Sequence, residues 1–303
     1  MSSDKKITII RLVIFLVIAC VPVYLITIAV NDALGAPMYS TPELSADPLT
    51  MLAGLGMLLP ALANIVTRLV TKQGFRDAML EFNFEKGRIK YYVMAIAVPI
   101  VYGAIGNLLT FLHAGADLGG IFSTEYLSDT IPMALSMPPM ILIGLSVFFG
   151  EELGWRGYLM PQLEKLMPLP AAVIVGGVIW GLWHAPMTVS GHNFGMEYAG
   201  FPYVGILLMC VDCVCMGSFL TLISRRTKSV WPAAIAHGVN NNCSVLLLLI
   251  FLNLKADPAA AGVQQDRITS MLVSFIPILV TGVVSYIMLC VDYKREKAAK
   301  AAA

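Results

Sequence analysis

Long apolar runs, separated by short polar connections, repeat along the whole 303-residue chain. A helix that crosses the roughly 30 Å hydrocarbon layer of a bilayer needs about 20 mostly apolar residues. Eight windows of the sequence meet that length: Ile7–Val30, Pro48–Val70, Tyr91–Leu112, Ile131–Gly150, Pro170–Val189, Tyr203–Ile223, Val230–Leu252 and Thr269–Val291. The pattern predicts an all-α, polytopic membrane helical bundle of about eight transmembrane helices, with residues 1–303 forming a single membrane domain.

The composition excludes a soluble globule. Apolar residues make up 58% of the chain, charged residues only 13%, and the mean hydropathy is +0.78. Soluble domains carry about 25% charged residues, which they need to cover their surface. The first window is too long for the roughly 7–15 apolar residues of a signal peptide, so we interpret it as a helix of the bundle.

The charges are distributed unevenly between the two sets of connections. The net charge is only +1, so nothing in it would attract nucleic acid, and we expect no nucleic-acid partner. Of the 20 basic residues, 18 lie at the two termini and after the second, fourth and sixth windows, whereas the other connections hold only Lys255 and Arg267 beside nine acids. The positive-inside rule therefore predicts cytoplasmic N- and C-termini. We expect an integral, multi-pass protein of a bacterial or archaeal type of cell membrane. The segment Gln73–Lys90 mixes aromatic and charged residues, which is typical of an interfacial helix or a cytoplasmic loop.

Ionisable residues are costly inside a membrane and are candidates for function there. Glu152 and Arg156 are spaced i,i+4, so a helix would place them on one face, where they can pair. Glu151 would point about 100° away and could face a cavity. If Pro138-Pro139 shifts the fourth span to about 140–163, the two glutamates lie in mid-membrane; otherwise they mark the cytoplasmic end of that span.

Two further spans carry histidines. His184 follows Trp180 by one helical turn, and His237 precedes Asn241 by one turn. Two hydrogen-bonding side chains on one face can hold an oxyanion, whereas the simpler alternative is a polar contact between helices. At about 1.5 Å per residue, His237 would lie roughly 10 Å and His184 roughly 21 Å from the cytoplasmic ends, so a bend near Pro168 or Pro170 would help them meet.

Taken together, these residues resemble the CAAX-protease and bacteriocin-processing superfamily (CPBP or Abi), which includes the Ras-converting type of CAAX prenyl endopeptidase. The family pattern is Glu-Glu-x-x-x-Arg, then Phe-x-x-x-His, then His-x-x-x-Asn/Asp. Residues Glu151–Arg156 fit the first motif, His184 fits the second with Trp180 in place of phenylalanine, and His237 with Asn241 fits the third.

The resemblance covers about 140–245, the expected catalytic core, and implies peptide-bond hydrolysis inside the membrane, reached from the cytoplasmic side. Catalytic roles would fall to Glu151 and His184, which would hold and deprotonate a water, and to His237 and Asn241, which would stabilise the oxyanion; the supporting residues would be Glu152, Arg156 and Trp180. Glu151, His184 and His237 are also a possible zinc set, but the chain lacks His-Glu-x-x-His, so we favour a metal-free mechanism with no certain cofactor.

Other polar residues have simpler interpretations. Asp212 lies among three cysteines that do not share one helix face, so we expect a hydrogen bond to an active-site group rather than a metal site. His113 and His192 lie at loop edges and are expected to be solvated.

The predicted function is an intramembrane endopeptidase acting on a membrane-embedded or lipidated, CAAX-like peptide or protein in the bilayer. The alternatives are a catalytically silent immunity or scaffold protein of the same fold and, less favoured, a transporter, which should show repeated halves. The sequence leaves open the physiological substrate, its prenylation and the oligomeric state.

Overall fold

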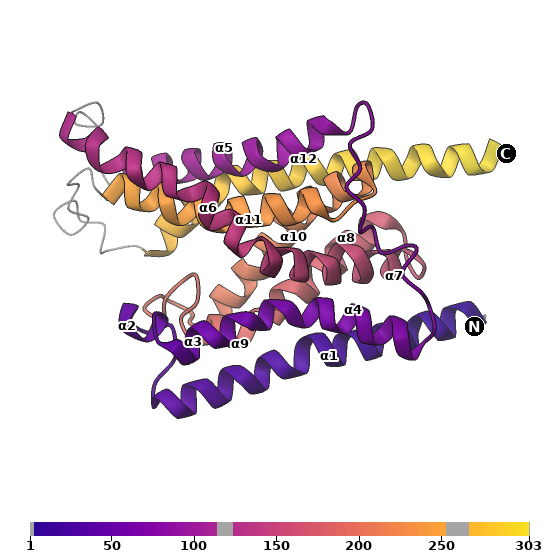
Figure 1. Cartoon of the computed structure of the whole chain (residues 1–303), viewed down its shortest axis with the longest axis horizontal. Coiled ribbons are helices and arrows are strands. Elements are labelled where there is room, and N and C mark those ends of the chain that lie inside the picture. The colour runs from indigo at the N-terminus through magenta and orange to yellow at the C-terminus, as the bar shows by residue number, and fades with distance from the viewer. Residues whose placement is uncertain (1–2, 114–123, 253–266, 303) are drawn as a thin grey trace.

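The computed structural model describes residues 3–113, 124–252 and 267–302, and the regular elements in these ranges are all helices (Figure 1). The predicted all-α class is confirmed. The helices are α1 (Ser3–Leu34), α2 (Pro42–Ser45), α3 (Pro48–Ala53), η1 (Gly54–Leu58), α4 (Leu59–Val70), α5 (Ile89–His113), α6 (Thr124–Gly154), η2 (Trp155–Leu159), α7 (Met160–Glu164), α8 (Leu169–Trp183), α9 (Ala185–Val189), α10 (Tyr203–Thr227), α11 (Trp231–Leu252) and α12 (Arg267–Ala302).

The protein is an integral, multi-pass membrane protein. Within the described ranges, five helical segments are long and apolar enough to cross a bilayer: Ser3–Leu34, Pro48–Val70, Ile89–His113, Tyr203–Thr227 and Leu272–Ala302. Helices α6 and α11 occupy the fourth and seventh predicted windows, and the shorter apolar helix α8 begins the fifth. The count of eight crossings stays a prediction.

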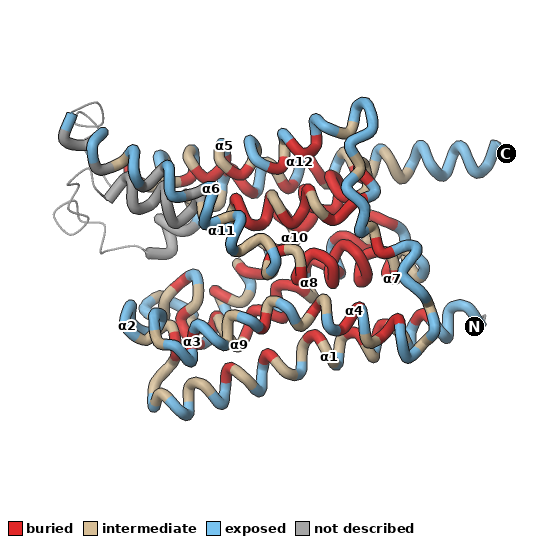
Figure 2. Tube along the Cα trace, viewed as in Figure 1, coloured by how far each residue is buried: buried red, intermediate tan, exposed pale blue. Residues whose placement is uncertain are grey.

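Helix α10 lies at the centre of the bundle, where it contacts α8, α11 and α12, while α1 and α4 pair along one side (Figure 1). In α10, 67% of the most apolar window is buried, against 22% in α1 and in α12. Buried positions accordingly concentrate in the middle of the bundle (Figure 2). The outer helices therefore turn large apolar side chains outward, as a lipid environment requires.

Glycines bring α8 and α10 together. A Cβ atom added to Gly177 would lie 2.5 Å from Cα of Val214, and one added to Gly181 would lie 2.5 Å from Cα of Cys210. Real Cβ atoms essentially never come so close to a backbone atom. This close approach, which is common between membrane helices, fixes the helix that carries Trp180 against the centre of the bundle.

Both termini lie at the same end of the bundle (Figure 1), and basic side chains link the segments that meet there. Arg225 forms ion pairs with Glu164 and Glu296, and Arg226 pairs with Asp292 at 2.6 Å. We call this the terminal end. Its assignment to the cytoplasm stays a prediction.

The connection between α4 and α5 is a loop, so the interfacial-helix alternative for Gln73–Lys90 is wrong. Its aromatic side chains fold back on the bundle instead: the ring of Phe82 stacks on Trp231 at 4.1 Å, and Trp231 donates its indole N–H to the carbonyl of Leu80. Left-handed backbone at Lys72 and Met79 prevents a continuous helix here.

Candidate active site

The two adjacent glutamates are fully buried near the end of α6, 0% exposed. Arg156 forms the expected i,i+4 ion pair with Glu152, with Nη1 of the arginine 3.0 Å from Oε2. We expected the α-helix to continue past this pair. Instead, Trp155–Leu159 form a wider π-helical turn. Helical structure nevertheless runs on through α7 to Glu164, so both carboxylates lie well inside the bundle.

Two tryptophans hold Glu151. The indole N–H groups of Trp155, at 3.1 Å, and of Trp180 both donate to Oε1 of Glu151. The second oxygen, Oε2, is buried and has no hydrogen-bond partner among the described residues. A carboxylate with one oxygen fixed and the other unpaired is suited to accept a proton from a water molecule.

The sequence indicated that His184 lies within a helix. In the structure it caps α8 at the junction with α9. Pro186 lacks the N–H that a continuous helix would offer to the carbonyl of Leu182, and the hydroxyl of Tyr24 donates to that carbonyl at 2.7 Å instead. Nδ1 of His184 lies 2.9 Å from the carbonyl of Trp180. Since a carbonyl only accepts, Nδ1 carries the hydrogen, and Nε2 of the neutral ring keeps its lone pair.

His237 contacts the other glutamate. Its Nδ1 donates to Oε1 of Glu152 at 2.8 Å, which joins α11 to α6. Asn241, one turn later, accepts a hydrogen bond at its Oδ1 from Asn240, whose own Oδ1 accepts from the hydroxyl of Tyr102. This relay orients the Asn241 amide and leaves its N–H groups without a partner among the described residues.

Trp180 joins the predicted site residues. Besides its bond to Glu151, its ring lies 5.9 Å from that of His184 and 5.5 Å from that of His237, between ring centroids. The guanidinium of Arg156 lies 4.3 Å from the Trp180 ring centroid. Three motifs far apart in the sequence thus meet around one indole.

A cavity of about 530 Å³ lies beside this cluster and is lined by Trp180, His184, His237 and Asn241. Glu151 does not line it, contrary to the expectation that this carboxylate faces a cavity; its Oε1 is instead held by the two indole N–H groups. The cavity has room for a peptide segment.

Other residues of the cavity were missed or misjudged from the sequence. His192 is not simply solvated, because it lines the cavity and its ring lies parallel to that of His184 at 6.4 Å. Burial lowers the pKa of His192 to about 4, so the ring is neutral at pH 7. Asp212 also lines the cavity, and its expected hydrogen bond to an active-site group stays a prediction. Tyr102, which lines the cavity too, was not singled out from the sequence, because only a contact pattern across helices could have identified it.

The zinc alternative does not fit this arrangement. Within the described part of the chain, no three His, Cys, Asp or Glu side chains come close enough together to hold a metal ion. Nδ1 of His184 and Nδ1 of His237 contact a carbonyl and a carboxylate, which leaves Nε2 of each ring as its remaining possible ligand atom. The metal-free preference stays a prediction.

Comparison with known proteins places the motifs in a family context. Residues 133–243, which include all three motifs, match the sequence model of the family "Type II CAAX prenyl endopeptidase Rce1-like". "CAAX prenyl protease 2" of Methanococcus maripaludis is 28% identical over 158 residues, 52% of this chain and 52% of that protein. "Lysostaphin resistance protein A" is 22% identical over 232 residues in Staphylococcus haemolyticus (75% of this chain, 58% of that protein) and 25% over 241 residues in Staphylococcus epidermidis (79% and 56%).

The chain spans little more than half the length of these curated relatives. The resemblance expected from the three motifs is confirmed: residues 133–243 are similar to the Rce1-like type II CAAX prenyl endopeptidases.

Proposed function

We propose that the protein is an intramembrane endopeptidase that hydrolyses a peptide bond of a membrane-embedded or lipidated peptide. The observation that carries the proposal is the convergence of Glu151, His184 and His237 around Trp180 beside a cavity of about 530 Å³. A buried carboxylate with one unpaired oxygen, next to two imidazoles of fixed orientation, is suited to general base catalysis.

In the proposed reaction, a water molecule lies between Oε2 of Glu151 and Nε2 of His184. Glu151 takes a proton as the water oxygen bonds to the substrate's carbonyl carbon. Glu152 is the counter-ion of a doubly protonated His237, whose Nε2–H donates to the oxyanion together with the amide of Asn241. The C–N bond then breaks, and the proton held by Glu151 passes to the leaving nitrogen.

The same contacts explain how Glu152, Arg156 and Trp180 would assist the reaction. Arg156 balances the charge of Glu152, which in turn fixes the ring of His237. Trp180 and Trp155 hold Oε1 of Glu151 and leave the other oxygen for water. For water to reach that oxygen from the cavity, the Trp180 side chain has to move aside.

A second candidate is a catalytically silent immunity or scaffold protein. Two observations favour it: the relatives named lysostaphin resistance protein A cover 75% and 79% of this chain, and Glu151 does not line the cavity. In that case, the glutamates and histidines would serve only to hold helices together.

The test is peptide cleavage by the purified protein in proteoliposomes, with a quenched fluorescent CAAX peptide in farnesylated and unmodified forms. We expect Glu151→Gln to lower kcat by at least about 100-fold, the usual contribution of a general base. Glu81→Gln, in the exposed α4–α5 loop, is the matched control and should retain full activity. Turnover should persist after dialysis against a chelator. Unchanged turnover by a folded Glu151→Gln protein would contradict the mechanism, and absence of cleavage by wild type across peptides would favour the silent alternative.

A further inference from the structure

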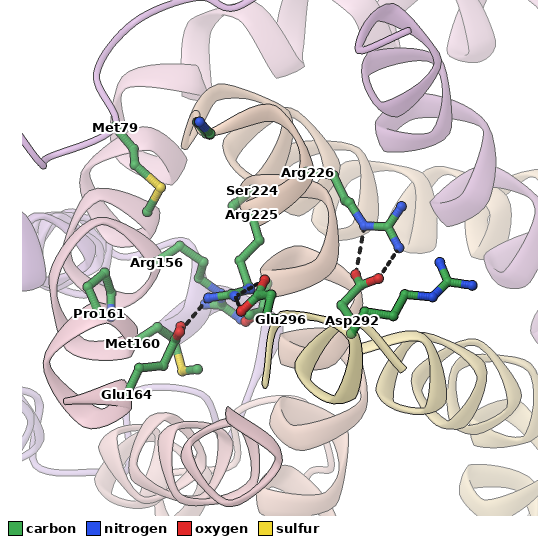
Figure 3. Close-up of a pocket in the computed structure, with 13 residues that line it drawn as sticks. Met79, Arg156, Met160, Pro161, Glu164, Ser224, Arg225, Arg226, Asp292 and Glu296 are labelled. Carbon is green, nitrogen blue, oxygen red and sulfur yellow. Dashed lines mark hydrogen bonds and ion pairs between the residues drawn. The ribbon is translucent and has the colours of Figure 1, made fainter. Parts of the chain in front are cut away.

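A second cavity, of about 560 Å³, opens at the terminal end of the bundle (Figure 3). It shares no lining residue with the active-site cavity, but Arg156, which pairs with Glu152 in the candidate active site, also lines it. Its walls come from the π-helical turn, α7, the last turns of α10 and the last part of α12, with Met79, Met160 and Pro161 forming an apolar side. We call it the terminal pocket.

The terminal pocket holds more basic than acidic groups. Two of its arginines are neutralised: Arg225 pairs with Glu164 and Glu296, and Arg226 pairs through two nitrogens with Asp292 (Figure 3). Both arginines also suit the last turn of α10, where a helix dipole favours cations. Ion pairs and the helix dipole therefore account for these two residues without any ligand.

Two further cations of the terminal pocket are unaccounted for. Lys228 and Arg295 line it and are exposed, and neither forms an ion pair within the described part of the chain. They place positive charge at the rim, where an anion would enter. Such unpaired charge beside a concave surface raises the local concentration of anions.

Two of the residues that line the terminal pocket are buried, and each carries a polar atom that lacks a partner among the described residues. Arg156 is 4% exposed and Ser224 is 1% exposed, and both line the pocket. Nη1 of Arg156 pairs with Glu152, but its Nε has no hydrogen-bond partner among the described residues, and the same holds for Oγ of Ser224. Leaving a buried donor unpaired is costly, about 1–3 kcal/mol. Since Nε only donates, the missing partner must be a hydrogen-bond acceptor.

We propose that the terminal pocket binds the phosphate group of an anionic phospholipid, with Arg156 and Ser224 as buried donors and Lys228 and Arg295 at its rim. The pocket lies where the apolar stretches of α10 and α12 give way to charged residues, which is where lipid headgroups are expected. Basic pockets between transmembrane helices are known to bind such headgroups. The apolar side offers a surface to the glycerol and upper acyl chain. The site shares Arg156 with the candidate active site, but the proposed lipid binding does not rest on the proposed peptidase activity.

The test is a binding titration on the purified full-length protein in detergent, read as a thermal stability shift. Three probes are compared: dioctanoyl phosphatidylglycerol, dioctanoyl phosphatidylcholine and inorganic phosphate. We expect phosphatidylglycerol alone to stabilise the wild-type protein at low concentration. The double variant Lys228→Gln/Arg295→Gln should bind about 25-fold more weakly, at about 5-fold for each charge. Ser224→Ala should weaken binding about 5-fold through loss of one hydrogen bond.

The matched control is Lys297→Gln/Lys300→Gln, which removes the same charge from the exposed end of α12 outside the terminal pocket and should leave binding unchanged. Equal stabilisation by phosphatidylcholine, or unaltered binding by the double variant, overturns the proposal. Stabilisation by inorganic phosphate equal to that by phosphatidylglycerol overturns the lipid source and assigns a soluble phosphate. If the double variant does not fold, Ser224→Ala decides.

Discussion

Trp180 occupies the position where the resembling family usually has phenylalanine, and its indole N–H gives Glu151 a hydrogen bond that phenylalanine could not. From the sequence, this departure was only the replacement of one aromatic side chain by another. In the structure it concerns the proposed general base itself, because the Trp180 indole and the Trp155 indole together fix one carboxylate oxygen.

We therefore expect Trp180→Phe to lower kcat for peptide cleavage by about 10-fold, which is the loss of one hydrogen bond to a charged group. KM should change little if the ring keeps its place beside the cavity. Trp231→Phe is the matched control, since its indole N–H donates to the carbonyl of Leu80 in the α4–α5 loop and not to a site residue. Equal kcat values for both variants would show that the hydrogen bond from Trp180 to Glu151 does not contribute to catalysis.

Contacts between residues could be predicted only where they are local. The pair Glu152–Arg156 follows from helical spacing, which needs no knowledge of the fold. The bond from His237 to Glu152 joins residues 85 positions apart, and periodicity carries no information about such a contact. The parallel rings of His192 and His184 were missed for the same reason, because a loop histidine has no pattern that distinguishes burial from solvation.

Among the elements, α8 determines where Trp180 and His184 lie, and two glycines determine where α8 lies. Because Gly177 and Gly181 face backbone atoms of α10 at van der Waals limits, a larger side chain would have to push the helices apart. Figure 2 shows α8 and α10 in the most buried part of the bundle.

Gly177→Leu is accordingly expected to destabilise the protein by about 1–3 kcal/mol or more, the usual cost of overpacking. The melting temperature should fall, and cleavage activity should fall with it as Trp180 shifts. Gly54→Ala is the control, because a Cβ atom there meets nothing within 4 Å. A Gly177→Leu protein with unchanged thermal stability would contradict the proposed close packing.

The helices themselves could be read from the sequence better than their ends. All eight apolar windows coincide with helical segments, because a run of about 20 apolar residues in lipid has little alternative to a helix. The break at His184 was signalled by Pro186 but was not recognised, since proline is tolerated in membrane helices. The π-helical turn after Gly154 has no sequence signature that we used.

At the scale of the whole molecule, the two cavities lie in different halves of the bundle. The terminal pocket lies beside the chain ends, whereas the active-site cavity is lined by Ser274 near the start of α12, by Asn107 in the second half of α5 and by Asn193 between α9 and α10. The family resemblance implies access from the cytoplasm, and the positive-inside rule puts the termini in the cytoplasm as well. Because the active-site cavity lies away from the chain ends, these two expectations cannot both be correct.

Cysteine labelling can decide between them. In a variant whose six native cysteines are replaced, Lys297→Cys and Asn193→Cys are treated with a membrane-impermeant maleimide in intact and permeabilised cells. The charge distribution predicts that Asn193→Cys reacts in intact cells and Lys297→Cys only after permeabilisation. The reverse pattern would contradict the predicted orientation and place the active-site cavity on the cytoplasmic side.

The π-helical turn between α6 and α7 also affects how this chain is aligned with other proteins. Such a turn accommodates one residue more than an α-helical turn, so Trp155–Leu159 are equivalent to a regular helix with one inserted residue. In an α-helix, each residue advances the face by about 100°. Alignment with a relative whose helix is regular therefore requires a one-residue gap within this turn. Without that gap, Glu152 and the buried Gln162 could not both occupy equivalent faces.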